Sequence, residues 1–248
     1  MSEISFDKYA VKGAYHWREY FGPIHRINAY TRARYRQVIA VLAAHQLPAG
    51  SHVLDAGCGD GALAGLIAKE LTARVTGIDT APQSIELAKQ EFAKRGLNGE
   101  FHLIDGYEYP FGDETFSAIV CSEVIEHVRE PKKMLLEMWR LLAPGGILVV
   151  TTPIRYTEMP LDRMHVQEWF PRAFREFCEG TLGRAVQTKL THPVVFAELY
   201  ASPHPLFGRI FRLTANVLSK CGVDLFAWEG FRAYSTQMAM AVKPAAEA

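Results

Sequence analysis

The stretch Val53-Leu-Asp-Ala-Gly-Cys-Gly-Asp-Gly61 joins a short apolar run to a segment of helical periodicity. The run at 52–55 predicts a buried strand, and residues from about 62 to 71 predict a helix. The glycines between them allow a tight turn and let a ligand approach the backbone. Taken alone, the G-x-G-x-x-A pattern at 57–62 also fits a dinucleotide-binding turn, a weakly specific signal.

Strand-like and helix-like segments alternate for about 100 residues beyond this loop. Short apolar runs of this kind suit strands buried on both faces of a parallel sheet. Right-handed crossovers then give a doubly wound α/β layer sandwich. The expected strands are 75–78, 101–104, 117–121 and 147–150, and the expected helices run from Pro82 to a stop at Gly96 and from Pro131 to 142.

The regular alternation fades after Thr152. We expect a loop with a short helix over 153–180, a strand over 185–195 and a helix over 204–220. A final strand is expected over 232–242. Upstream, residues 24–46 predict a helix that ends before Pro48.

Composition sets bounds on the class of protein. The chain has 248 residues, and its 27 basic side chains balance 27 acidic ones. It therefore lacks the basic excess that is typical of nucleic-acid-binding proteins. The polar N-terminus lacks the apolar core of a signal peptide, and no run of 18 apolar residues predicts a spanning helix. The four cysteines form no CxxC pair and are typical of reduced thiols. These observations favour a cytoplasmic protein.

Two acidic residues sharpen the reading of the glycine loop. Asp55 lies two residues before the first glycine, where its carboxylate can accept a bond from an ammonium group but would repel a pyrophosphate. Asp79 follows 24 residues later, at the end of the second expected strand, where an acid can bind ribose hydroxyls. The pair therefore favours a nucleoside ligand that carries an amine.

Five segments in order resemble the motifs of class I S-adenosylmethionine-dependent methyltransferases. They are VLDAGCGDG, VTGIDTAPQSIELAKQ, Ile104-Asp105-Gly106, FSAIVCSEVIEHV and LLAPGGILVVTTP, and together they cover roughly residues 50–152. The resemblance implies a Rossmann-like methyltransferase fold: a mostly parallel seven-stranded sheet whose final strand, placed in 232–242, is antiparallel.

The same resemblance implies S-adenosylmethionine as cofactor and assigns its binding residues. Glycines and an acid would hold the methionine part, a second acid the ribose and a third the adenine. The residues so assigned are Asp55, Gly57 and Gly59 for methionine, Asp79 and Thr80 for the ribose and ring, Asp105 and Gly106 for adenine, and Ser122 at the end of the fourth strand. Cys58 is expected to be a packing residue.

The stretch CSEVIEHV, residues 121–128, follows the fourth expected strand and therefore borders the site. It resembles ubiquinone-biosynthesis O-methyltransferases, in which Glu123 would line the site and His127 would act as a general base or position the acceptor. It also resembles metal-dependent small-RNA 2′-O-methyltransferases, which add a later histidine, here His165. In that reading Glu123, Glu126, His127 and His165 bind Mg²⁺ or another divalent cation such as Mn²⁺.

Alternatives stay open at this point. If these residues bind no metal, Glu126 and His127 would cap a helix, and His165 would be an ordinary loop residue. The leading function is an S-adenosylmethionine-dependent O-methyltransferase acting on a hydroxyl of a small molecule or glycoside, with His127, His165 and Glu123 as catalytic candidates. The rivals are an N- or C-methyltransferase without metal, a non-catalytic cofactor-binding scaffold and an NAD-dependent oxidoreductase.

Two segments outside the motifs complete the expected organisation. Residues 1–46 are predicted to form an N-terminal helical lid, with Tyr15 and His16 as lid candidates, before a methyltransferase domain over 47–248. Substrate-side insertions are expected at about 153–180 and 196–230. The helix over 204–220 has an apolar and a basic face, so it fits the protein core, a dimer partner or a peripheral membrane contact.

Overall fold

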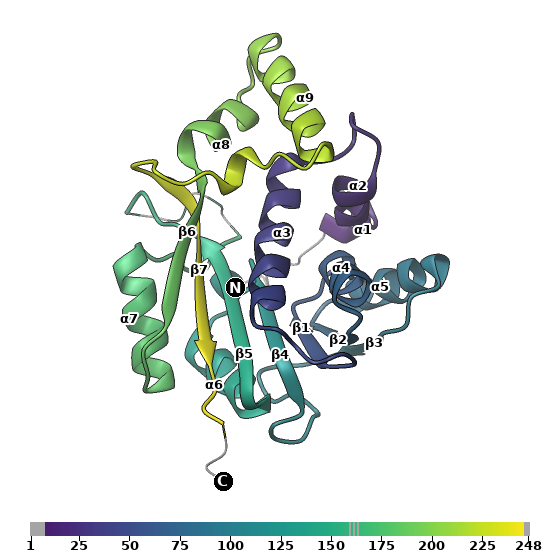
Figure 1. Cartoon of the computed structure of the whole chain (residues 1–248), viewed down its shortest axis with the longest axis vertical. Coiled ribbons are helices and arrows are strands. Elements are labelled where there is room, and N and C mark those ends of the chain that lie inside the picture. Colours follow the sequence, from purple (N-terminus) through teal and green to yellow (C-terminus); the bar gives the residue numbers. More distant parts are fainter. Residues whose placement is uncertain (1–7, 159, 161, 163, 246–248) are drawn as a thin grey trace.

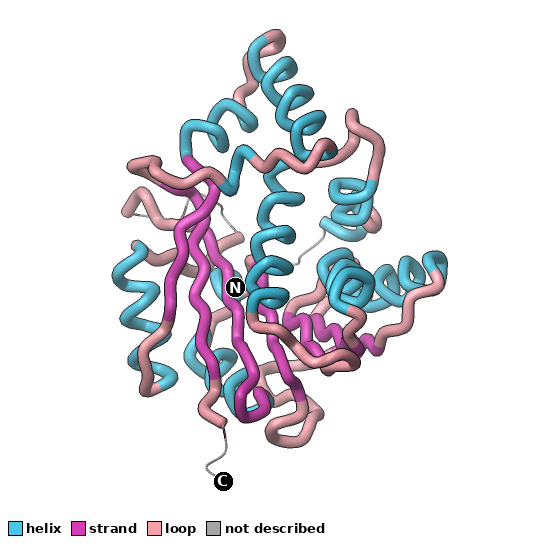
Figure 2. The backbone as a smooth tube through the Cα atoms, viewed as in Figure 1, coloured by secondary structure: helices cyan, strands magenta, loops and turns pink. Residues whose placement is uncertain are grey.

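A mixed seven-stranded sheet with the order β3-β2-β1-β4-β5-β7-β6 forms the centre of the computed structural model (Figures 1 and 2). The structure describes residues 8–158, 160, 162 and 164–245; residues 1–7 of the predicted lid and 246–248 of the predicted domain lie outside them. The strands are β1 His52–Ala56, β2 Arg74–Asp79, β3 Glu100–Leu103, β4 Phe116–Ser122, β5 Leu142–Pro153, β6 Gln187–Pro193 and β7 Tyr234–Val242.

Helices cover both faces of this sheet (Figure 1). They are α1 Lys8–Lys12, α2 Tyr15–Phe21, α3 Ala29–Ala44, α4 Ala62–Leu71, α5 Pro82–Arg95, α6 Pro131–Leu141, α7 Pro171–Leu182, α8 Val194–Ala201 and α9 Phe207–Lys220, with short 3₁₀ turns η1 Ile125–His127 and η2 Leu225–Ala227.

Alternate residues of each central strand belong to different cores. Val53 packs with α2, α3, α4 and α5 on one face, whereas Leu54 packs with α6 and α7 on the other. In β5, Val149 belongs to the same core as Val53, and Val150 belongs to the same core as Leu54. This is why the strands read as continuous apolar runs: both faces of the sheet are buried.

The strand order reverses between β1 and β4, which is the topological switch point of the sheet. All pairings from β3 to β5 are parallel, so the carboxyl ends of these strands meet at one edge. Ligands of open α/β sheets bind at such an edge. β7 runs antiparallel to both β5 and β6, so the predicted antiparallel final strand is confirmed.

Helix boundaries follow local capping chemistry. Pro82 opens α5 and Gly96 ends it in the left-handed conformation, as expected. The predicted start of the 24–46 helix was wrong: α3 begins at Ala29 because the Asn28 side chain accepts hydrogen bonds from the amides of Tyr30 and Thr31.

The later part of the chain holds more helix than expected. The short helix predicted within 153–180 is α7, which extends to Leu182. The strand predicted over 185–195 ends at Pro193, and α8 follows directly. Its sequence, VVFAELYA, is apolar nearly all round, so it carries no helical periodicity to distinguish it from a strand.

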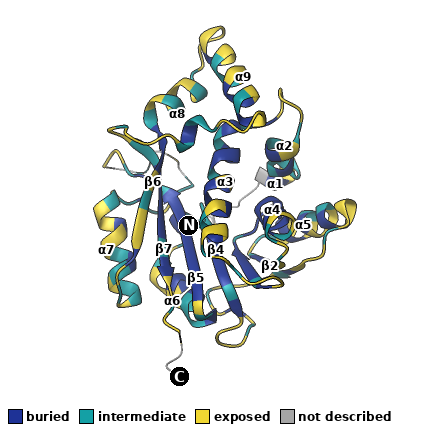
Figure 3. Ribbon diagram, viewed as in Figure 1, coloured by how far each residue is buried: buried dark blue, intermediate teal, exposed yellow. Residues whose placement is uncertain are grey.

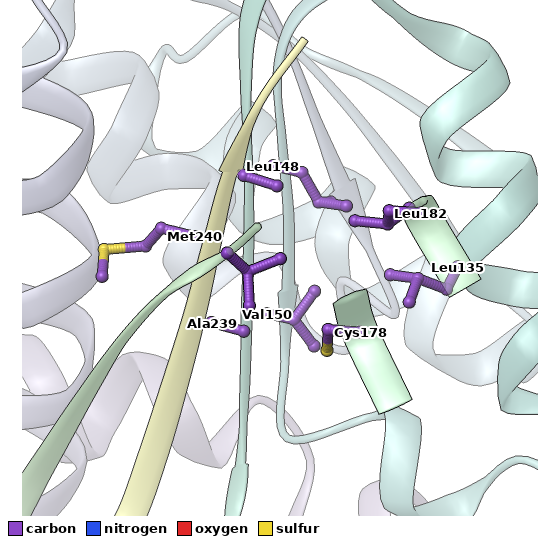
Figure 4. Close-up of a pocket in the computed structure, with 9 residues that line it drawn as sticks. Leu135, Leu148, Val150, Cys178, Leu182, Ala239 and Met240 are labelled. Carbon is purple, nitrogen blue, oxygen red and sulfur yellow. The ribbon is translucent and has the colours of Figure 1, made fainter. Parts of the chain in front are cut away.

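A small apolar cavity of about 10 Å³ lies between the sheet and helices α6 and α7 (Figure 4). Its lining includes Leu135, Val150, Cys178 and Leu182. A space of this size and polarity holds no organic ligand. The cavity is a packing gap and contains none of the predicted cofactor residues.

Candidate active site

Three acidic residues lie at or just beyond the carboxyl ends of three adjacent parallel strands. Asp55 lies on β1, Asp79 ends β2, and Asp105 comes just after β3. The fold therefore brings the acids predicted for the methionine, ribose and adenine parts of the cofactor to one edge of the sheet. Asp105 and Gly106 are exposed there, and so is Thr80.

Asp55 is a buried carboxyl with an unsatisfied oxygen. Its side chain is almost fully buried, and Oδ2 has no hydrogen-bond partner among the described residues. Burial, and next the charge of Asp79, raises the pKa of Asp55 to about 7. A ligand ammonium at this oxygen would satisfy it and favour its charged form, which is the chemistry expected of a methionine amine.

Asp79 organises the glycine loop from the neighbouring strand. Its Oδ2 accepts a hydrogen bond from the Gly59 amide at 2.9 Å, and Oδ1 accepts one from the Ala81 amide at 2.8 Å. Burial is the main cause that raises the pKa of Asp79. The loop is thus tied to the end of β2, where the ribose would bind.

The loop leaves no room for a side chain at Gly57 or at Gly59. Gly57 and Gly59 both have positive φ, and a Cβ on Gly57 would collide with Val124. A Cβ on Gly59 would collide with the hydroxyl of Tyr9 in α1. Cys58 is buried in the core on the α4 side of the sheet, in the packing position expected for it.

The N-terminal helices lie against this loop. Asp60 is fully buried; its Oδ2 accepts from the His16 amide at 2.9 Å, and its carbonyl accepts from Trp17 Nε1 at 2.6 Å. Tyr9 Oη lies 3.3 Å from His16 Nδ1, and the rings of Tyr15 and His16 are 3.9 Å apart. The two lid candidates therefore lie beside the cofactor loop.

Glu123 begins the turn after β4 with a φ of 57°, unusual for a residue with a side chain. Its Oε2 lies 3.3 Å from Arg34 Nη1, and its Oε1 accepts from Thr151 Oγ1 at 3.1 Å. Ser122 Oγ lies 3.0 Å from the same threonine hydroxyl. Burial, the largest single influence, lowers the pKa of Arg34, but Glu123 acts together with Tyr35 and Tyr30 to outweigh it, and the pKa is raised.

Glu126, His127 and His165 come together from two segments. One ligand atom from each lies within 4.8 Å of the others, and the two imidazole rings are 4.9 Å apart. The loop is held there because the Glu126 carbonyl accepts from the amides of Val166 and Gln167. Among the described residues, this trio forms without Glu123, which instead contacts Arg34 and Thr151.

Hydrogen bonds fix the tautomers of both histidines. His127 Nδ1 lies 2.9 Å from the Met164 carbonyl, and a carbonyl only accepts, so Nδ1 carries the hydrogen. His165 Nδ1 lies 2.5 Å from Glu168 Oε1, where the carboxylate accepts in the same way. In the neutral rings, each Nε2 therefore presents a lone pair.

Sequence reasoning missed several residues of this site. Arg34 is one of four arginines between 26 and 36, and nothing in that pattern distinguishes it. Glu168 and Tyr9 likewise gain their role only through tertiary contact. Asp60 did offer a signal, since it is an acid inside the glycine loop itself.

Comparisons with known proteins agree with this geometry. A family described as "Methyltransferase domain" matches residues 54–150. A ubiquinone biosynthesis O-methyltransferase of Roseobacter denitrificans is 31% identical over 187 residues, which cover 71% of this chain and 74% of that protein. The corresponding protein of Xanthomonas axonopodis pv. citri is 34% identical over 152 residues, 60% of this chain and only 61% of its own length.

A solved structure shows the same fold. The phosphoethanolamine N-methyltransferase 2 of Haemonchus contortus, in complex with S-adenosyl-L-methionine, aligns with a TM-score of 0.66 at 17% identity. The alignment covers 98% of this chain and 61% of that one. The sequence matches and the loops at the carboxyl ends of the strands together show the class of protein. The chain belongs to the class I S-adenosylmethionine-dependent methyltransferases.

Proposed function

We propose that this protein transfers a methyl group from S-adenosylmethionine to a hydroxyl of a small molecule. The buried, unsatisfied Asp55 oxygen and the bare backbone at Gly57 and Gly59 fit this cofactor, which supplies an electrophilic methyl group when bound. The relatives from Roseobacter and Xanthomonas carry the name O-methyltransferase, which supports oxygen as the acceptor atom. The role of these relatives in ubiquinone biosynthesis favours a phenolic or quinol acceptor, and a glycoside hydroxyl is the other acceptor class.

One observation carries the proposed chemistry: the tautomer of His127. Its Nδ1 donates to the Met164 carbonyl, so Nε2 is the nitrogen that accepts a proton from the acceptor hydroxyl. His165 has the same tautomer through Glu168. Glu123, held by Arg34 at the end of β4, would position the acceptor.

Two binding measurements test the cofactor and the enzyme class. Calorimetry should show binding of S-adenosylhomocysteine and none of NAD; tight NAD binding without a response to S-adenosylhomocysteine would refute the proposal. A methyl-transfer screen over catechols, quinol precursors, sugars and amines then tests the acceptor. Turnover of amines alone would favour N-methylation, and binding without any turnover would favour the scaffold.

A second candidate adds a divalent cation, and the trio Glu126, His127 and His165 favours it. Two imidazole nitrogens and a carboxylate oxygen can bind a divalent cation such as Mn²⁺, and Mg²⁺ would need further oxygen ligands; both histidines already donate the N–H of their other ring nitrogen to an oxygen, as metal ligands do. Such an ion would lower the pKa of a bound hydroxyl. Glu123 is the fourth predicted ligand and would have to leave Arg34 to join.

The metal candidate predicts that EDTA abolishes activity and that Mn²⁺ or Mg²⁺ restores it. His165→Ala should lose this response and lower kcat by about 100-fold or more while S-adenosylhomocysteine still binds. Glu168→Gln should weaken metal affinity by roughly tenfold, because it orients His165. Full activity in EDTA would leave His127 as the base without a metal.

The N-terminal segment, residues 1–46, is proposed to cover the cofactor as a lid of the domain formed by 47–248. The contacts of Tyr9, His16 and Trp17 with Gly59 and Asp60 support this. The insertions at about 153–180 and 196–230 would line the acceptor side. A cytoplasmic location belongs to the same proposal and is supported by four cysteines that remain free thiols.

A further inference from the structure

Helix α9 carries an apolar stripe on the side that faces away from the protein. Its exposed side carries Leu206, just before the helix, then Ile210, Leu213 and Val217, at spacings of i, i+4, i+7 and i+11 that form one stripe. With the neighbouring Phe207, these side chains are between 39% and 71% exposed. A helix that packs on a core normally turns such a stripe inward.

The inward face of α9 is smaller and more polar, although half-buried Phe211 packs from it against Phe196 and the cluster around Phe226. Its buried residues are Gly208, Ala215, Asn216 and Ser219. Asn216 alone makes four hydrogen bonds that fix the helix: Oδ1 accepts from the Ala29 amide and the Tyr200 hydroxyl, and Nδ2 donates to two carbonyls before α3. The orientation of α9 is thus set by specific bonds, and these leave the apolar stripe outside.

The neighbourhood of the stripe is basic. The segment between Glu198 and Asp224 contains Arg209, Arg212 and Lys220 and no acidic residue, in a chain whose charges balance overall. Arg209 and Lys220 are exposed, and helical geometry places both along one flank of the stripe. Arg212 lies on the inner side, where it donates to the Tyr200 and Ser202 carbonyls.

The position of the surface adds a third argument. Figure 1 shows α8 and α9 projecting beyond the carboxyl-end edge of the sheet, and Figure 3 shows exposed residues along their outer side. α8 adds exposed Val195 and Leu199. The helix packs on α3, which supplies Arg34 to the acceptor side of the site.

We propose that the stripe Leu206, Phe207, Ile210, Leu213 and Val217, which we call the α9 stripe, inserts into the interface of an anionic lipid bilayer. Large apolar side chains flanked by cations on a helix lying in the membrane plane have this chemistry. No described helix is long and apolar enough to cross a bilayer, so the contact is peripheral. The bound protein would meet lipid-soluble acceptors at the edge where its site opens.

A second copy of the chain fits the same surface less well. Two-fold pairing of α9 with itself would place Arg209 and Lys220 of both copies around one contact, and α9 carries no acid to pair with them; Glu198 of α8 is an exposed acid beside this surface. Like charges in that arrangement repel, whereas phosphate-bearing lipid headgroups attract them. The charges beside the stripe therefore favour an anionic lipid surface over a second copy of the chain.

Co-sedimentation with vesicles of pure phosphatidylglycerol and of pure phosphatidylcholine tests the proposal. The full chain should partition to phosphatidylglycerol, less so at high salt, and only weakly to phosphatidylcholine. I210S/L213S should reduce the partition by about tenfold or more. R209Q/K220Q should reduce it by roughly tenfold and remove most of the salt dependence.

Leu136→Ser, which removes an exposed leucine of α6, is the matched control and should bind vesicles like the unchanged chain. Circular dichroism melting shows that each variant is folded. The proposal fails if the folded, unchanged chain does not sediment with phosphatidylglycerol or binds both vesicles equally. It also fails if the lipid-free chain is a dimer that I210S/L213S converts to monomers, because a second copy would then cover the stripe.

Discussion

Asp55 combines burial with an oxygen that the described residues do not satisfy. A carboxyl in that position is most stable when protonated, which is why its pKa is raised to about 7. A bound ammonium reverses the preference, because the two opposite charges then satisfy each other away from water. The residue thus links cofactor affinity to pH.

We expect the affinity for S-adenosylhomocysteine to rise from pH about 6 to about 8 and then level off. The raised pKa means that free protein must lose a proton before the ammonium binds, and this penalty disappears above about pH 7. Asp55→Asn should lower affinity by about 10- to 100-fold and flatten the profile. Calorimetry over this pH range measures both effects.

Asp105→Asn serves as the comparison, because Asp105 is exposed at the same edge. It should weaken binding to a similar extent at each pH and leave the slope intact. The same linkage has a consequence for the cofactor-free protein. The folded state keeps the Asp55 proton between about pH 4 and 7, whereas the unfolded chain releases it, so this residue destabilises the fold as pH rises through that window.

At the scale of elements, α1 and the glycine loop are complementary in shape. The loop contributes bare backbone at Gly59, and α1 contributes the Tyr9 hydroxyl, which fills the space where a Cβ would stand. Asp60 then fixes α2 through His16 and Trp17. The proposed lid therefore depends on glycine at one position of the loop.

Gly59→Ala should destabilise the protein by more than Gly96→Ala, which is the matched control. Both glycines have positive φ, so both variants strain the backbone by about 1 kcal/mol. Only at Gly59 does the added Cβ meet another side chain, whereas nothing lies within 4 Å at Gly96. Urea unfolding should show an excess loss of about 1 to 3 kcal/mol for Gly59→Ala.

In a Tyr9→Ala background, which carries its own loss from the missing buried ring, Gly59→Ala should cost little more than Gly96→Ala, because the colliding ring is gone. Equal losses for the two glycine variants, or an excess that survives Tyr9→Ala, would show that α1 does not pack on the loop in solution.

At the scale of the whole molecule, His192 joins the outer strand β6 to helix α3. Its Nε2 donates to the Tyr30 carbonyl, and its Nδ1 lies 2.9 Å from Thr191 Oγ1. The ring is fully buried. Burial is the main cause that lowers the pKa of His192 to about 3, so the histidine stays neutral in the folded protein.

We expect His192 to contribute to acid unfolding. The unfolded chain binds a proton at this histidine below about pH 6.5, whereas the folded protein does so only near pH 3. Between these values the free energy of unfolding decreases as the solution is made more acidic, by roughly 1.4 kcal/mol per pH unit from this residue. Urea titrations at several pH values should show a smaller slope in His192→Gln than in the unchanged protein.

His204→Gln alters an exposed histidine and should keep the original slope. The raised pKa of Asp55 acts in the opposite direction, so the difference between variants, not the absolute slope, isolates His192. An unaltered slope in His192→Gln would show that the buried ring does not govern acid sensitivity.

The sequence by itself determined the layered fold and the cofactor loops, because these depend on local patterns. Apolar runs buried on both faces, capped helices and a glycine turn each follow from neighbouring residues. The acids Asp55, Asp79 and Asp105 follow successive strands, and parallel pairing alone brings such positions to one edge. The family resemblance rests on those same loops.

Only the tertiary structure decided which distant side chains meet. His165 joins Glu126 and His127 because backbone bonds draw its loop to η1, whereas Glu123 is held by Arg34 from α3. The orientation of α9 was equally open, since an amphipathic pattern does not state which face turns inward. Asn216 decides it through bonds to residues almost 190 positions earlier in the chain, a separation that no local pattern encodes.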